Sequence, residues 1–311
     1  MNLLNQAPIT LFVYNRPEHT QKTINALRRN KLAEESELFI FSDGEKNQED
    51  KQKVKEVRGI INNINGFKNI EIFKSETNKG LAESVINGVT KIINDYGKVI
   101  VLEDDLITSK IFLRYMNRAL DFYEDSKDIW SISGYNLPIN IPEDYEYDIY
   151  LAYRAASWGW ATWNNRWKKI DWEIRDFDNF INDKSKQRLF NRGGSDMTRM
   201  LKNQINGEID SWAIRWCYNQ FKEDSYTIYP VKSKVKNIGM DGSGVHCGVS
   251  NKHEVRLDSG NNKVEFSNNL ELNKKILYNF KKHYGPDTFK GKIGLLLRKT
   301  GLYKIVKKII K

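Results

Sequence analysis

The feature that most constrains this chain is a short apolar run that ends in three consecutive acids. Residues 98–105 read Lys-Val-Ile-Val-Leu-Glu-Asp-Asp, so the run leads directly into Glu103, Asp104 and Asp105. Its β-branched composition predicts a strand buried on both faces, as in the middle of a parallel sheet. Because side chains alternate along a strand, Glu103 and Asp105 would face one side and Asp104 the other.

Three adjacent carboxylates repel one another, and two explanations fit them. A divalent cation that holds a phosphorylated ligand would relieve the repulsion, and carboxylate oxygens suit such a cation. A solvated acidic loop is the plainer alternative. The buried strand that precedes the acids favours the cation.

The first third of the chain alternates between apolar runs and amphipathic stretches. Strands are predicted over residues 8–14, 37–42, 69–74 and 99–102, and helices over 17–29, 54–64 and 80–96. This alternation predicts an α/β fold with a parallel sheet and right-handed crossovers. The pattern is less regular afterwards, with a helix expected over 109–123, strands over 129–133 and 148–153, and a helix from 207–212 to about 221.

We therefore expect three parts: a nucleotide-binding half (1–106), an acceptor-binding and catalytic half (107–260) and a basic C-terminal tail (261–311). The net charge of +10 is concentrated in that tail, because residues 272–311 hold twelve Lys and Arg and one acid, Asp287. A protein that binds nucleic acid would spread basic residues over its folded face. The distribution therefore predicts no nucleic-acid partner.

The last eleven residues, 301–311, predict a basic amphipathic helix. Its apolar residues follow helical spacing, and four lysines lie off that face: Leu302, Ile305, Val306, Ile309 and Ile310, with Lys304, Lys307, Lys308 and Lys311. Such a helix binds an anionic membrane surface, although a helix docked on the protein's own core would also fit.

Two cysteines, Cys217 and Cys247, are too few for a disulfide framework, and their spacing fits no zinc motif. The first residues lack the features of a signal peptide, and no apolar run approaches the ~20 residues of a membrane-spanning helix. We expect a soluble body in the cytoplasm, held peripherally at the inner face of the membrane by the tail.

Polar residues follow each predicted strand of the first half. Asn15 and Arg16 follow the first strand, Asp43 the second and the turn 77–80 the third, ahead of the acids after the fourth. Ligands of such sheets bind beyond the carboxyl ends of the strands. Neither a GxGxxG fingerprint nor a GxxxxGK[ST] loop is present. The sequence therefore predicts a nucleotide held by side chains and a metal.

Four short motifs, in this order, resemble those of the GT-A fold glycosyltransferases. They are Asn15-Arg16-Pro17, Ser42-Asp43-Gly44, Thr77-Asn78-Lys79-Gly80-Leu81-Ala82 and Glu103-Asp104-Asp105. The Glu-Asp-Asp version is most similar to the branch with the inverting Golgi mannosyl-glycoprotein N-acetylglucosaminyltransferase and its bacterial relatives of polysaccharide synthesis. The resemblance covers roughly residues 8–250.

The resemblance implies roles for the residues of the first half. Asp43 would accept a hydrogen bond from the base, Arg16 would line the base pocket, and Asn78 and Lys79 would lie near the base or diphosphate. Asp105 would coordinate Mn²⁺ or Mg²⁺. For Asp43 a turn before Gly44 is an equal alternative, and Lys79 also fits a solvated loop charge.

The remaining acids, Glu103 and Asp104, would by the same resemblance bond the ribose or the donor sugar. A glycine-containing loop, Trp158-Gly159-Trp160, would touch donor and acceptor sugars, since glycine permits close approach and indole faces stack on sugars. A tryptophan-rich core is the alternative, and we prefer it for Trp163 and Trp167.

In the second half the resemblance implies that Asp210 is the general base and that His246, in a glycine-rich stretch, reaches the same metal. Asp210 would otherwise be a helix N-cap, and both roles are compatible. His246 would otherwise touch phosphate without a metal.

Together these features predict an inverting, metal-dependent glycosyltransferase. It would move a sugar from a nucleotide sugar, which we expect to be linked to UDP, to a hydroxyl of a glycan or lipid-linked acceptor in surface polysaccharide synthesis. A sugar-phosphate nucleotidylyltransferase is one alternative, although the glycine-rich basic loop of that class is missing after the first strand. A non-catalytic carbohydrate-binding subunit is the other.

Overall fold

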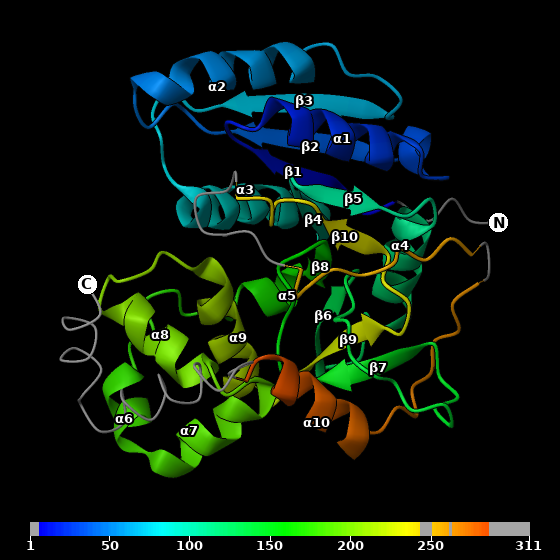
Figure 1. Cartoon of the computed structure of the whole chain (residues 1–311), viewed down its shortest axis with the longest axis vertical. Coiled ribbons are helices and arrows are strands. Elements are labelled where there is room, and N and C mark those ends of the chain that lie inside the picture. Colours follow the sequence, from blue (N-terminus) through cyan, green and yellow to red (C-terminus); the bar gives the residue numbers. More distant parts are fainter. Residues whose placement is uncertain (1–5, 243–250, 261–262, 286–311) are drawn as a thin grey trace.

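The computed structural model describes residues 6–242, 251–260 and 263–285. An eight-stranded sheet in the order β3-β2-β1-β4-β8-β6-β9-β7 organises the fold (Figure 1). Its strands are β1 (Ile9–Val13), β2 (Glu37–Ser42), β3 (Asn69–Lys74), β4 (Lys98–Glu103), β6 (Ile129–Ser133), β7 (Ile149–Ala152), β8 (Trp160–Trp163) and β9 (Tyr226–Pro230). A separate two-stranded ribbon pairs β5 (Leu106–Thr108) with β10 (Val235–Asn237).

The first four strands confirm the predicted parallel sheet. β1 pairs in parallel with β2 and β4, and β2 with β3. The crossover helices are α1 (Pro17–Arg28), α2 (Gln48–Ile61) and α3 (Leu81–Tyr96). Because neighbouring residues of a strand face opposite sides, Leu11 packs in the cluster that includes α1 and α2, while Phe12 packs in the cluster that includes α3.

The strand beside β4 was not expected. Residues Trp160–Trp163 form β8, which pairs antiparallel with both β4 and β6. The sequence Trp-Ala-Thr-Trp alternates large and small side chains, but four residues are too few for that period to stand out. Since β8 joins β4 to the rest of the sheet, the two predicted halves of the chain share one sheet.

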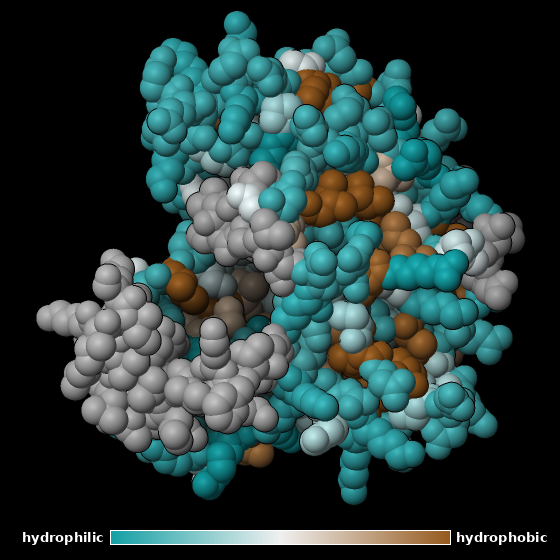
Figure 2. Space-filling model, in the orientation of Figure 1, coloured by the Kyte–Doolittle hydropathy of each residue, from teal (hydrophilic) through white to brown (hydrophobic). Residues whose placement is uncertain are grey.

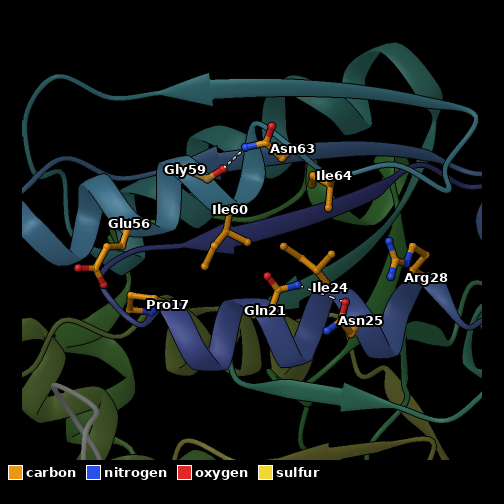
Figure 3. A pocket seen from close by; sticks show the side chains of 10 residues that line it. All are labelled: Pro17, Gln21, Ile24, Asn25, Arg28, Glu56, Gly59, Ile60, Asn63 and Ile64. Atoms are coloured by element: carbon orange, nitrogen blue, oxygen red, sulfur yellow. Dashed lines mark hydrogen bonds between the residues drawn. The ribbon is translucent and has the colours of Figure 1, made fainter.

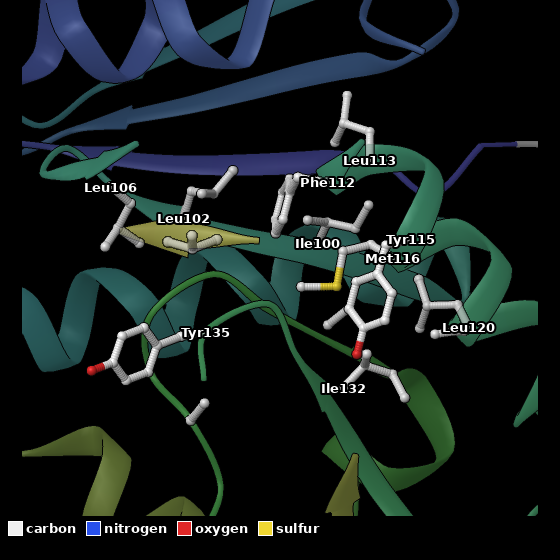
Figure 4. Close-up of a cluster of buried hydrophobic side chains, with 14 of the residues drawn as sticks. Ile100, Leu102, Leu106, Phe112, Leu113, Tyr115, Met116, Leu120, Ile132 and Tyr135 are labelled. Carbon is white, nitrogen blue, oxygen red and sulfur yellow. The ribbon is translucent and has the colours of Figure 1, made fainter. Parts of the chain in front are cut away.

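Two buried clusters hold the sheet from its two faces. Figure 4 shows part of the first, where Ile100 and Leu102 of β4 meet Phe112 and Met116 of α4 (Phe112–Phe122), all fully buried. The second is aromatic and joins β6, β8, α5 (Asn164–Trp167) and α9 (Trp212–Lys222). Six tryptophans form ring contacts in it: Trp130, Trp160, Trp167, Trp172, Trp212 and Trp216.

Helices of the second half complete the fold. They are α6 (Phe177–Asn182), α7 (Lys184–Phe190), α8 (Met197–Ile205) and α10 (Lys274–His283), with two 3-10 turns at Ala33–Glu35 and Asn191–Gly193. In α10, Ile276 and Phe280 are buried, and the Phe280 ring lies 5.2 Å from that of Tyr229.

Within the described ranges, no helix has the length and apolar character that a bilayer span requires. The predicted amphipathic helix 301–311 lies outside the described residues.

Candidate active site

The three acids lie at the carboxyl end of β4, beside the end of β1, as the sequence predicts. The register of the two strands places Phe12 opposite Glu103, so the turn after β1 reaches the acids. There, one nitrogen of Arg16, Nη2, donates hydrogen bonds to Asp104 Oδ1 and Asp105 Oδ2, each at 2.9 Å. A single guanidinium therefore bridges two of the three carboxylates.

The contacts of two residues bear on their expected roles. The Arg16 guanidinium is paired with the acids, and its expected place in the base pocket stays a prediction. Asp104 is buried, and its second oxygen accepts the backbone N–H of Tyr14 at 3.2 Å. Both of its oxygens thus bind the turn that follows β1, and its expected bond to the ribose or the donor sugar stays a prediction.

One guanidinium cannot neutralise three carboxyl groups, of which Asp104 and Asp105 are buried and Glu103 is partly buried, and the pKa values reflect this. Burial, followed by the charges of Asp105 and Asp104, raises the pKa of Glu103 to about 8. Burial also raises the pKa of Asp104, although Arg16 opposes the shift. At neutral pH Glu103 therefore holds a proton, and the site favours any further positive charge.

Asp105 has one oxygen that fits a cation. Its Oδ1 is buried and has no hydrogen-bond partner in the described part of the chain. Leaving a buried carboxylate oxygen unsatisfied is costly, so an ion at this position would stabilise it. No group of three or more potential metal ligands is found in residues 6–242, 251–260 and 263–285. A cation here would therefore have one protein ligand, Asp105 Oδ1, and would take its other ligands from phosphates and water.

Asp43, at the end of β2, organises the turn before α3. Its carboxylate accepts the backbone N–H groups of Lys79 at 2.9 Å and Gly80 at 3.0 Å, and the side-chain amide of Asn78 at 3.1 Å. Asn78 also donates to the carbonyl of Gly44 at 2.9 Å. Asp43 and Asn78 thus form one hydrogen-bonded knot, while the Lys79 side chain is exposed.

Two residues of α2 that the sequence analysis did not single out form hydrogen bonds beside this knot. Arg58 donates to the carbonyls of Asp43 at 3.3 Å and Ser75 at 2.6 Å, which fixes the ends of β2 and β3 together. Asp50 accepts the Asn15 side chain at 2.6 Å and the Tyr14 hydroxyl at 2.8 Å. Asn15, expected at the ligand, is therefore an internal tie.

Asp210 lies where the second half meets this turn. A Cβ on Gly80 would be 3.6 Å from Asp210 Oδ2, and Arg215 Nη2 is 3.9 Å from Asp210 Oδ1. Gly80 is the N-cap of α3, so the carboxylate lies beside the positive end of a helix. The expected N-cap role of Asp210 is wrong, because Ser211 caps α9 by accepting the N–H of Ile214 at 3.4 Å.

The Asp210 side chain is 57% exposed and still close to the nucleotide half. A charged, accessible carboxylate with two favourable electrostatic neighbours can act as a hydrogen-bond acceptor for an incoming hydroxyl.

The two tryptophans of the Trp158-Gly159-Trp160 stretch differ in burial. Trp158 is half-buried and packs edge-on against Tyr135, with ring centroids 4.8 Å apart. Trp160 is only 1% exposed within the tryptophan cluster, so its expected contact with a sugar is wrong. Gly159 has φ of +60°, and a Cβ there would be 2.7 Å from Val235, so packing rather than ligand approach requires the glycine. Trp163 and Trp167 are core residues, as preferred from the sequence.

A segment after β10 crosses the acids. The N–H of Ile238 donates to the Asp105 carbonyl at 2.8 Å, and Gly239 follows directly. His246 lies outside the described residues, so its expected role at the metal stays a prediction.

Figure 2 shows a recess between the positions that α3 and α9 occupy in Figure 1. A separate groove of about 510 Å³ lies between α1 and α2, lined by residues such as Ile24, Arg28 and Ile60 (Figure 3). It contains none of the expected site residues, so we assign it no role in the site.

A protein-family comparison agrees with this geometry. The model described as "Glycosyl transferase family 2" matches residues 9–171, which is more than half of the chain and includes the acids, the Asp43 knot and the Trp158 stretch. The chain belongs to glycosyl transferase family 2. Its mostly parallel sheet flanked by helices is the GT-A fold of nucleotide-sugar glycosyltransferases.

No curated protein matches the chain. Similar solved structures include S. aureus TarS (11% identity, TM-score 0.40, covering 79% of this chain and 37% of that one). Others are S. aureus TarS 1-349 in complex with UDP (11%, 0.39, 73% and 59%) and "Mannosyltransferase PcManGT from Pyrobaculum calidifontis in complex with GDP-Man and Mn2+" (10%, 0.35, 51% and 45%). This chain spans 37–59% of their lengths, and at these scores what they bind says nothing about it.

Proposed function

We propose that the chain is an inverting glycosyltransferase that uses Mn²⁺ or Mg²⁺. It would move a sugar from a nucleotide sugar, linked to UDP, to a hydroxyl of a glycan or lipid-linked acceptor in surface polysaccharide synthesis. The observation that carries the proposal is the meeting of Asp210 with Gly80, one residue from the Asp43–Asn78 knot. It brings a candidate base from the second half to the nucleotide turn of the first.

The residues divide the work as follows. The Asp43 knot gives the turn at 78–80 a fixed shape against which a nucleotide can bind. Asp210 accepts the proton of the acceptor hydroxyl as its oxygen bonds to the anomeric carbon from the face opposite the diphosphate. The bond from that carbon to the diphosphate oxygen breaks in the same displacement, which inverts the configuration.

The leaving diphosphate carries negative charge that the site must offset. The positive charge of Arg16 is already balanced by Asp104 and Asp105, so Arg16 alone cannot offset the charge of the diphosphate. When bound at Asp105 Oδ1, a divalent cation would supply the larger part of that charge stabilisation. Glu103, protonated at neutral pH, adds no further negative charge to the site.

A donor-hydrolysis and transfer assay tests the proposal. Wild-type protein is incubated with a panel of UDP-sugars and Mn²⁺, and the released UDP and the anomeric configuration of any product are measured. Asp105→Ala should lower turnover by roughly a thousandfold, because it removes the charge stabilisation at the leaving group. Asp95→Ala, an exposed acid near the end of α3, should leave turnover unchanged.

No UDP release from any donor would contradict the enzyme and favour the non-catalytic carbohydrate-binding subunit. Retained configuration would contradict inversion. Release of pyrophosphate from a nucleoside triphosphate and a sugar phosphate would favour the nucleotidylyltransferase.

We further propose that the protein works in the cytoplasm, bound peripherally to the anionic inner face of the membrane through residues 301–311. The lysines and apolar residues of that sequence support the proposal. Full-length protein should sediment with vesicles that contain phosphatidylglycerol and not with pure phosphatidylcholine. A chain truncated after residue 300 that still sediments with the anionic vesicles would contradict it.

A further inference from the structure

Residues 238–241 cover the pair of Asp105 and Arg16. Gly239 is so close that a Cβ on it would be 2.1 Å from Asp105 Oδ2 and 2.6 Å from Arg16 Nη1. Real Cβ atoms never approach that closely, so only glycine allows the backbone to lie here. The segment therefore forms one wall of the position where the proposed function places the donor diphosphate.

His19 holds the outer side of the same segment. Its Nε2 lies 3.3 Å from the carbonyl oxygen of Ile238 and 3.1 Å from Asp241 Oδ2. Both partners are acceptors, so Nε2 carries the hydrogen and donates. The imidazole is well covered, at 12% exposed, which strengthens these hydrogen bonds relative to exposed ones.

The Ile238 residue is thus held at both ends of its backbone. Its N–H donates to the Asp105 carbonyl at 2.8 Å, and its carbonyl accepts from His19. His19 and Arg16 belong to the same turn at the start of α1, three residues apart. The first turn of α1 therefore contacts both parts of the site: Arg16 binds the acids, and His19 binds residues 238–241 above them.

We propose that His19 is a positioning residue for binding of the donor diphosphate. It keeps residues 238–241 in place over Asp105 and Arg16 before the nucleotide arrives. Fixing the backbone of a residue costs conformational entropy, and a segment that is already ordered does not add this cost to binding. The inference rests on the proposed function, because it assigns the diphosphate to the Asp105–Arg16 pair.

Isothermal titration of the full chain with UDP and Mn²⁺ tests this role. His19→Ala should weaken UDP binding about tenfold and make the binding entropy less favourable, because the segment must then be ordered on binding. His19→Gln should stay within about threefold of wild type, since its amide N–H can donate to the same acceptors. Lys22→Ala, an exposed change on the same helix, should have no effect.

Asp241→Ala removes the carboxylate partner of His19 without changing any residue of α1. The Asp241 side chain is 49% exposed. The substitution should weaken UDP binding in the same direction. The double variant should be little worse than His19→Ala alone, because His19→Ala already removes the contact between His19 and Asp241. In turnover assays, His19→Ala should raise the donor KM and leave kcat within about twofold.

Three outcomes overturn this inference and leave the proposed function standing. They are wild-type UDP affinity in both His19→Ala and Asp241→Ala, a fully additive double variant, and a His19→Gln variant that folds but binds UDP as poorly as His19→Ala. Thermal melts of each variant show whether a loss of affinity comes from a loss of fold. Wild-type protein that fails to bind UDP contradicts the proposed function instead.

Discussion

The two halves of this molecule prepare their functional residues in opposite ways. In the nucleotide half nearly every polar group at the strand ends is paired with another: Arg16 with Asp104 and Asp105, and Asp43 with the turn that follows β3. In the acceptor half, Asp210 is exposed and has one ion-pair partner at 3.9 Å.

The rigidity of the acceptor half comes from apolar packing. Six of its tryptophans pack with ring centroids 4.7 to 5.8 Å apart. The difference suggests that the first half is built to hold a nucleotide in one pose, while the second positions a single acid on a rigid aromatic core. Four variants would break or sharpen this contrast.

Asp210→Asn should have the largest effect. Without a general base, kcat should fall by roughly a hundredfold to ten-thousandfold. Stability should hardly change, since an exposed ion pair contributes at most about 1 kcal/mol. Steady-state kinetics and UDP titration separate the two, with Glu208→Gln, two residues earlier, as the matched control. A large change in UDP affinity would show that Asp210 belongs to the nucleotide site.

Trp160→Ala tests the aromatic core. Removing a fully buried indole should lower the free energy of unfolding by about 3–5 kcal/mol, measured by chemical denaturation. The matched variant is Trp158→Ala, whose side chain is half-buried. It should cost less stability and should raise the KM of donor or acceptor instead. Equal stability losses in the two variants would contradict the division of this stretch into core and site.

Asp43→Ala tests the knot of the nucleotide half. It removes the acceptor of three backbone N–H groups, those of Gly44, Lys79 and Gly80, and one of the two acceptors of the Asn78 amide, so stability should fall by about 2 kcal/mol and UDP should bind more weakly. Glu49→Ala, on the exposed first turn of α2, is the control. If UDP affinity is unchanged while stability falls, the knot is structural only.

Glu103→Gln should give the smallest effect, visible as a pH dependence. The pKa of Glu103 is raised from 4.5 to about 8, so the folded state binds its proton more tightly than the unfolded state does. Its contribution to stability is therefore fully present below pH 4.5 and is lost as the pH rises toward 8. The variant should melt a few degrees higher than wild type at pH 8.5 and show a smaller gain at pH 6. A gain that is the same at both pH values would place the titration elsewhere.

Much of the first half follows from local patterns in the sequence. Apolar runs and glycine turns predict β1 to β4 and their helices, and strand ends of a parallel sheet meet at one edge, so the acids and Arg16 could be expected together. In the second half, β8 was hidden in four residues, and Ser211 rather than the neighbouring Asp210 took the cap.

By itself the sequence determined which polar groups stand at the ends of which strands, because alternation and strand polarity are local properties of the chain. Only the tertiary structure decided what those groups touch: that Arg16 bridges two acids, that Asn15 and Asn78 face inward, and that His19 and Gly239 meet over Asp105. Some of these contacts join residues more than 200 positions apart, such as His19 and Ile238 at a separation of 219, and their geometry depends on how helices and strands pack. No local pattern encodes such a distance.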